Sequence, residues 1–183
     1  SLPGALLGAL LGNIVESRVK RQRNARHYEA AQSALLDAAF SVMGYLAKLD
    51  GRVSESEIAF ANTIIKRMEL GSQQRKRAIE QFRLGKQGHF DLDGVLAPLF
   101  RASRRYPDLQ RTFIEIQLQL LYVEGEPAPI QKEALTEIGH SLGIQRMQMA
   151  SLISMAAART SQQQTRQRRH KKPNFTITQP LDD

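Results

Sequence analysis

Three acidic side chains near two similar turns could supply oxygen ligands to a cation. Asp50 precedes a glycine at the end of one apolar stretch and Glu57 follows seven residues later, while Glu124 precedes a glycine at a comparable place further along. Calcium takes six to eight oxygen ligands, so these three carboxylates supply fewer ligands than a typical calcium site needs. Ser54 and Glu57 also match the S-x-x-E capping box of a helix start. Two roles therefore stay open for the acids, a structural cap and turn or a weak divalent-cation site, and no other cofactor is expected.

A second acidic string, FDLDGVL at residues 90–96, is similar to the nucleophile motif of haloacid-dehalogenase-type phosphatases. In that family the first aspartate attacks phosphorus, and the motif ends a buried strand. Here residues 85–89 (GKQGH) precede it and cannot form such a strand, so the required context is missing. We expect Asp91 to cap a helix instead, with a phosphatase as the alternative. No other group of residues suggests catalysis, so no catalytic residue is assigned and the chain is not expected to be an enzyme.

The net charge is concentrated at the two ends of the chain. There are 26 basic and 18 acidic residues, yet residues 27–158 hold 15 of each. The surplus consists of Arg18, Lys20, Arg21, Arg23 and Arg26 at one end and Arg159, Arg166, Arg168, Arg169, Lys171 and Lys172 at the other. A nucleic-acid-binding module is the alternative that this charge suggests, but the neutral centre argues against it, and both basic flanks lack aromatic residues for base stacking. We therefore expect no nucleic-acid partner. A minor alternative for the tail is contact with anionic lipid or RNA.

The amino-terminal segment has the character of a membrane helix. Residues 2–15 carry no charge, and the basic residues follow them, as is typical of the cytoplasmic side of a membrane span. Fourteen residues are too few to cross a bilayer, which takes about 20, so we interpret them as the end of a transmembrane helix. Gly4, Gly8 and Gly12 share one helix face and could let two such helices pair closely. The alternative is the start of a buried amphipathic helix.

Apolar residues recur every three or four positions through the rest of the chain, which predicts helices. We predict about seven, which run from about Glu16 to Lys48, Ser54 to Met68, Ser72 past Phe82, Asp91 past Phe100, Pro107 past Leu121, from after Pro127 and Pro129 to Gly143, and Arg146 to Ala158. No stretch alternates convincingly as a strand would. The predicted fold class is therefore all-α.

The sequence also contains an internal repeat with an offset of 74 residues. The acid–glycine pair at Asp50 aligns with that at Glu124, Leu46 aligns with Leu120, and Ile64 aligns with Ile138. Each unit reads as a helix, an acid–glycine turn and two further helices. We expect the two units to pack into one core with pseudo-symmetry.

The blocks FSVMGYLAKLDGRVSESEI, FIEIQLQLLYVEGE and HSLGIQRMQ resemble the TerB-like domain of the DjlA family of DnaJ-class co-chaperones. The resemblance covers nearly the whole chain. It implies a glycine-rich transmembrane helix, a cytoplasmic TerB-like helical domain, a polar linker and a J domain. The acids of the TerB-like motif, suspected metal ligands, are kept as Asp50 and Glu57. The second copy has Glu124 for the aspartate and Gln131 for the later acid, which puts a second metal site in doubt.

These observations divide the chain into four segments. With the resemblance, we expect residues 1–15 to be the end of a transmembrane helix, 16–27 a basic juxtamembrane helix start, 28–158 the TerB-like domain, and 159–183 a basic disordered linker towards a J domain outside this chain. A J domain engages a DnaK-type chaperone through a His-Pro-Asp motif, and the 183 residues lack that tripeptide.

The resemblance implies a single-pass protein of the bacterial inner membrane with this domain in the cytoplasm, linked to the stress response. The domain would act as an interaction and spacer module rather than a catalyst. The expected partners are a DnaK-type chaperone through the J domain, membrane lipid, a second copy through the transmembrane helix, and an unidentified protein bound by the TerB-like domain.

Overall fold

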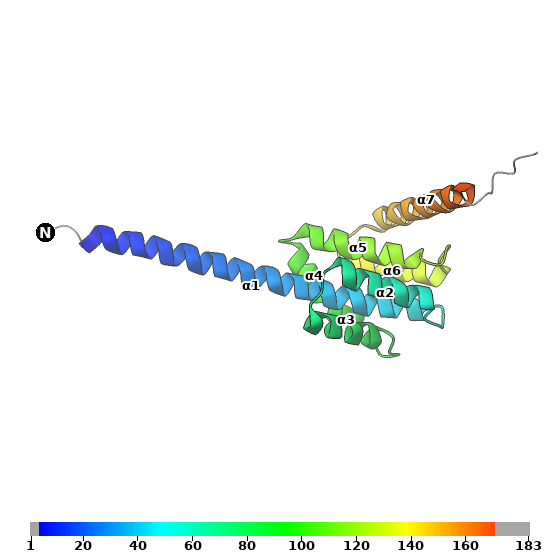
Figure 1. The fold of residues 1–183 in the computed structure, drawn as a ribbon, viewed down its shortest axis with the longest axis horizontal. Helices are drawn as coiled ribbons and strands as arrows, with labels where there is room; N and C mark the ends of the chain where they lie inside the picture. The colour runs from blue at the N-terminus through cyan, green and yellow to red at the C-terminus, as the bar shows by residue number, and fades with distance from the viewer. Residues whose placement is uncertain (1–3, 171–183) are drawn as a thin grey trace, which may run out of the picture.

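The computed structural model describes residues 4–170, with side-chain surroundings for residues 23–162 and 165. The described residues form seven helices and no strand, which confirms the all-α prediction (Figure 1). The helices are α1 (Gly4–Lys48), α2 (Glu55–Arg67), α3 (Ser72–Gly85), α4 (Leu92–Ser103), α5 (Pro107–Leu121), α6 (Pro129–Ser141) and α7 (Arg146–His170).

Helix α1 has two halves with different surroundings. Its amino-terminal half extends alone away from the bundle, whereas its second half runs through the bundle against α3, α4 and α5 (Figure 1). Residues 23–30 are exposed, but Phe40, Met43 and Leu46 have no exposed surface. Complete burial of such a side chain stabilises the fold by about 1.5–3 kcal/mol. The second half of α1 is therefore the central element of the core.

The predicted repeat is present in the structure, because equivalent helices begin 74 residues apart. Helix α2 begins at Glu55 and α6 at Pro129, while α3 begins at Ser72 and α7 at Arg146. The second half of α1 corresponds to α5. The turn glycines, Gly51 and Gly125, have φ angles of 102° and 118°, a conformation that glycine adopts without strain. The chain is thus built from two units, α1–α2–α3 and α5–α6–α7, with α4 between them in sequence.

The two units pack reciprocally into one core. Helix α2 of the first unit contacts α5 of the second, and α6 of the second contacts α1 of the first. Fully buried side chains from both units meet there, among them Leu46, Phe113, Leu120, Leu135 and Ile138. Helix α4 closes the core through Leu96 and Leu99, which are also buried.

The helix predicted for the amino-terminal segment and the helix predicted from about Glu16 form one continuous helix, α1, which begins at Gly4. Alanine and leucine favour this helix, and no proline interrupts the run after Pro3. Helix α7 continues to His170, so residues 159–170 of the predicted disordered linker are helical. This extension is rich in glutamine and arginine and meets no proline before Pro173. The remaining linker residues, 171–183, and the first three residues of the predicted membrane segment lie outside the described residues.

Candidate functional site

The three acids singled out in the sequence lie around one cavity. Asp50 lies in the turn after α1, Glu57 in the first turn of α2, and Glu124 in the turn after α5. All three line a cavity of about 270 Å³, together with Leu120 and Gln131. The two acid–glycine turns meet there because the units pack reciprocally.

Glu57 is the buried member of this group, with 5% of its surface exposed. The Ser54 amide donates to Glu57 Oε2 at 2.9 Å and the Glu57 amide donates to Ser54 Oγ at 3.1 Å, which confirms the predicted capping box. Burial raises the pKa of the Glu57 carboxyl, and the charges of Asp50 and Glu124 raise it further, against the opposing hydrogen bonds from Ser54. The site therefore favours a protonated Glu57 more than water does.

Gln131 occupies the position equivalent to Glu57 in the second unit, and its amide makes two hydrogen bonds. Its Oε1 accepts from the Ala128 amide at 3.0 Å, as Glu57 accepts from Ser54. Its Nε2 donates to the Leu46 carbonyl oxygen at 3.2 Å. An ionised glutamate cannot make the second bond, because it has no hydrogen to donate. The two units thus place a neutral amide and an acid in equivalent buried positions.

The cavity brings the acids together without assembling a ligand set for a metal. Across the described residues, no three histidine, cysteine, aspartate or glutamate side chains gather closely enough to hold an ion. Asp50 is exposed and accepts a long hydrogen bond, 3.4 Å, from the Arg52 amide. The local geometry is that of a cap and a turn.

The phosphatase alternative fails on its structural context. Asp91 is the N-cap of α4, and its Oδ1 accepts from the Gly94 amide at 2.9 Å. Asp93 is exposed in the first turn of the same helix. The string at residues 90–96 therefore begins a helix and does not end a strand.

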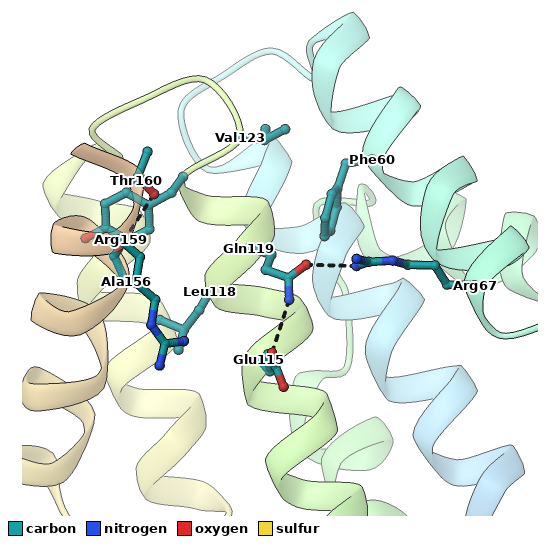
Figure 2. Close-up of a pocket in the computed structure, with 10 residues that line it drawn as sticks. Phe60, Arg67, Glu115, Leu118, Gln119, Val123, Ala156, Arg159 and Thr160 are labelled. Carbon is teal, nitrogen blue, oxygen red and sulfur yellow. Dashed lines mark hydrogen bonds between the residues drawn. The ribbon is translucent and has the colours of Figure 1, made fainter. Parts of the chain in front are cut away.

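A larger groove, which the sequence patterns did not predict, lies on the outer face of α5. It has a volume of about 630 Å³ and is walled by α2 on one side and α7 on the other (Figure 2). Its lining includes Phe60 and Arg67 of α2, Glu115, Leu118 and Gln119 of α5, and Ala156 and Arg159 of α7. The available signal was a mismatch within the repeat: Gly44 of the first unit aligns with Leu118 of the second.

The predicted membrane features belong to the projecting half of α1. Gly4, Gly8 and Gly12 lie on its helical backbone, as do Arg18, Lys20 and Arg21, and the side chains of these residues lie outside the described set. Arg23 and Arg26 are exposed. Over the described residues, no helix combines the length and the apolar character that a membrane span requires.

Comparison with known proteins gives a family match. Residues 36–154 match the family of the tellurite resistance protein TerB. The chain is 37% identical over 154 residues to the co-chaperone protein DjlA of Yersinia pseudotuberculosis, which covers 83% of this chain and 56% of the relative. It is 30% identical over 160 residues to DjlA of Haemophilus influenzae, with 85% and 56% covered. The chain thus spans little more than half the length of these curated relatives. No solved structure matches significantly.

Proposed function

The chain belongs to the TerB family, and from this premise we propose that it is the interaction and spacer domain of a membrane-anchored co-chaperone of the DjlA type. The observation that carries the proposal is the similarity to co-chaperones over 83–85% of this chain. Those relatives extend well beyond the matched region. We propose that the whole protein regulates a DnaK-type chaperone through a J domain outside the present 183 residues.

The shape of the molecule supports a spacer role. The projecting half of α1 leaves the bundle at one end, and α7 points away at the other (Figure 1). A membrane anchor attached to α1 and a J domain attached after α7 would therefore be held apart by the helical bundle. The groove on the outer face of α5 supports a role in binding.

The sequence of the projecting helix supports anchoring in the bacterial inner membrane, with the bundle on the cytoplasmic side. An uncharged stretch at residues 2–15 comes before the basic cluster that begins at Arg18. The glycines at positions 4, 8 and 12 favour pairing of two such helices. A bilayer reporter assay of association tests this: Gly8→Leu should weaken pairing in the complete membrane segment, and unchanged association would remove the glycine face as its source.

Stimulation of ATP hydrolysis by a DnaK-type chaperone tests the co-chaperone role. The 183-residue chain should not stimulate hydrolysis, because it contains no His-Pro-Asp tripeptide. The longer natural protein should stimulate it, and replacing the histidine of its His-Pro-Asp motif should remove the effect. Clear stimulation by the 183-residue chain, or none by the longer protein, would contradict the proposal.

A further inference from the structure

We propose that the groove between α2, α5 and α7 is a docking site for an amphipathic helix of another protein, with carboxylates along both flanks of its apolar face. The inference rests on the proposed role as an interaction domain and names the kind of partner it binds. The evidence is a comparison between two equivalent helix faces. The face of α5 at the groove is open, whereas α3 covers the equivalent face of α1 in the first unit.

In the first unit, α3 lies directly against α1. A methyl group added at Gly44 would lie 2.1 Å from the Phe82 carbonyl oxygen, and one added at Gly85 would lie 1.8 Å from the Ser41 carbonyl oxygen. Each glycine therefore lets the two backbones touch. A bidentate ion pair adds to the contact, in which Arg77 Nε and Nη2 donate to Asp37 Oδ1 and Oδ2, each at 2.6 Å.

In the second unit, larger residues occupy the equivalent positions and α7 lies further from α5. With the 74-residue offset, Leu118 replaces Gly44 and Arg159 replaces Gly85. The ion pair is also absent, because Arg111 and Ser151 stand at the positions of Asp37 and Arg77. Helix α7 packs mainly on α6 and contacts α5 only lightly. The groove is thus the open counterpart of the closed contact between α1 and α3.

The repeat indicates that a helix suits this surface. The groove floor on α5 includes Glu115, Leu118 and Gln119, which are equivalent to Ser41, Gly44 and Tyr45 on the face of α1 against which α3 packs. Helix α3, which has 14 residues, covers that face of α1. The groove volume of about 630 Å³ lies within the range of pockets that enclose drug-sized ligands, about 300–1,000 Å³, so it can accept several side chains from one helix face.

The charges on the groove walls determine which side chains suit the flanks of a docked helix. Arg67 on α2 and Arg159 on α7 stand on opposite sides, with Leu118 on the floor between them (Figure 2). Arg67 Nη1 donates to the neutral Gln119 Oε1 at 3.2 Å, and Gln119 Nε2 donates to Glu115 Oε1 at 3.4 Å. Within the described part of the chain, neither arginine forms an ion pair. Carboxylates on both edges of a docked helix would meet these two guanidinium groups.

Two segments at the ends of the chain carry the wrong charge for this groove. The projecting half of α1 is uncharged over residues 4–15 and then basic from Arg18 to Arg26, so its charged part in a second copy would be repelled by Arg67 and Arg159. The tail at residues 171–183 begins with two lysines, which carry the same charge as the two arginines. These two segments are therefore poor occupants, and we assign the acidic helix to a partner protein.

The test uses two labelled helical peptides with the same leucine face, one flanked by glutamates and the other by lysines. Fluorescence anisotropy with the 183-residue chain should show binding of the glutamate peptide and at least tenfold weaker binding of the lysine peptide. The double variant Arg67→Glu/Arg159→Glu should weaken binding of the glutamate peptide by about tenfold or more, because two exposed attractive charge pairs become repulsive. Gln119→Trp, which fills the groove floor, should also weaken binding.

The matched control is Arg75→Glu/Arg101→Glu, which makes the same charge change at exposed positions on α3 and α4 and should leave binding unchanged. Circular dichroism checks that each variant is folded. Equal binding of both peptides, equal weakening by the control, or no binding of the glutamate peptide would overturn the proposal.

Two further measurements test the other occupants. If removal of residues 171–183 shifts the amide resonances of groove residues, the tail occupies the groove and the proposal is wrong. If sedimentation shows self-association that Gln119→Trp abolishes, the occupant is a second copy, which also overturns it. Neither the binding nor the sedimentation assay contains a DnaK-type chaperone, so their outcome is independent of the ATPase test above.

Discussion

The first and second units share their helix boundaries but differ in how the third helix packs. Helix α3 closes against α1, whereas α7 leaves a groove beside α5. The difference follows from a few positions, above all Gly44 against Leu118 and Gly85 against Arg159. A repeated fold can therefore close the helix contact in one unit and leave a groove in the other, without changing the order or the start of its helices.

The same comparison applies to the buried polar position at the start of the second helix in each unit. Glu57 and Gln131 both cap their own helix, but only Gln131 also donates to a backbone carbonyl of the other unit. The glutamate instead lies beside two further acids, Asp50 and Glu124, and has a raised pKa. The first unit thus has the closer helix contact, and its cap holds an acid where the second unit has a neutral amide.

The largest expected effect comes from closing the space between α1 and α3. Gly44→Ala should lower the free energy of unfolding by about 3 kcal/mol, although alanine favours a helix, because the added methyl group overlaps the Phe82 carbonyl oxygen. Urea unfolding measures the change. Gly88→Ala is the matched control, since no atom lies within 4 Å of the added carbon, and it should be nearly neutral. Equal stability of the two variants would show that α3 can move away at little cost.

The next largest effect comes from giving the second unit the acid of the first. Gln131→Glu should lower the free energy of unfolding by about 2 kcal/mol at pH 7, because it removes the bond to the Leu46 carbonyl and buries a carboxylate. Gln148→Glu makes the same change at an exposed position on α7 and should have little effect. If both variants unfold at the same urea concentration, the amide of Gln131 contributes nothing to the contact between the units.

The reverse exchange should stabilise the protein. Glu57→Gln keeps the acceptor for the Ser54 amide and removes a buried charge, so the free energy of unfolding should rise by about 1 kcal/mol at pH 7. Glu57→Ala serves as a control, because it removes the charge and the cap together and should not stabilise. A Glu57→Gln protein less stable than the wild type at pH 7 would mean that the ionised carboxylate is needed.

The pH dependence sharpens this prediction. Because the folded-state pKa of Glu57 is raised, the folded protein binds this proton more tightly than the unfolded chain does. Glu57 therefore destabilises the protein most at a pH above its folded-state pKa. The destabilisation decreases as the pH falls through the folded-state pKa towards the ordinary pKa of 4.5. The stability advantage of Glu57→Gln should shrink over the same range. An advantage that stays constant with pH would exclude this explanation.

The smallest expected effect is at the exposed acid of the turn. Asp50→Asn should change the free energy of unfolding by no more than about 0.5 kcal/mol, because Asp50 is exposed and makes one long hydrogen bond. It should also abolish any shift in melting temperature that millimolar calcium or magnesium causes in the wild type. A cation shift that survives the substitution would place the bound ion elsewhere, whereas no shift in the wild type would leave the acids as cap and turn residues.

Much of the fold could be predicted from local signals in the sequence. The capping box at Ser54, the proline at Pro107 and the turn glycines at Gly51 and Gly125 act through backbone geometry within a few residues. The 74-residue repeat was likewise evident from the sequence, because equivalent apolar positions face the same core. The far end of α7 was not predicted, since helix-favouring residues continue there without a stop signal.

The candidate sites depended on tertiary structure, because their properties arise between residues far apart in the chain. The acids at positions 50, 57 and 124 could be picked out as candidates, yet only packing of the two units makes Glu57 a buried carboxyl beside two other charges. No sequence motif predicted the groove. Leu118 and Arg159 are ordinary helix residues in the sequence, and they acquire their role because each stands where the other unit needs a glycine for two backbones to touch.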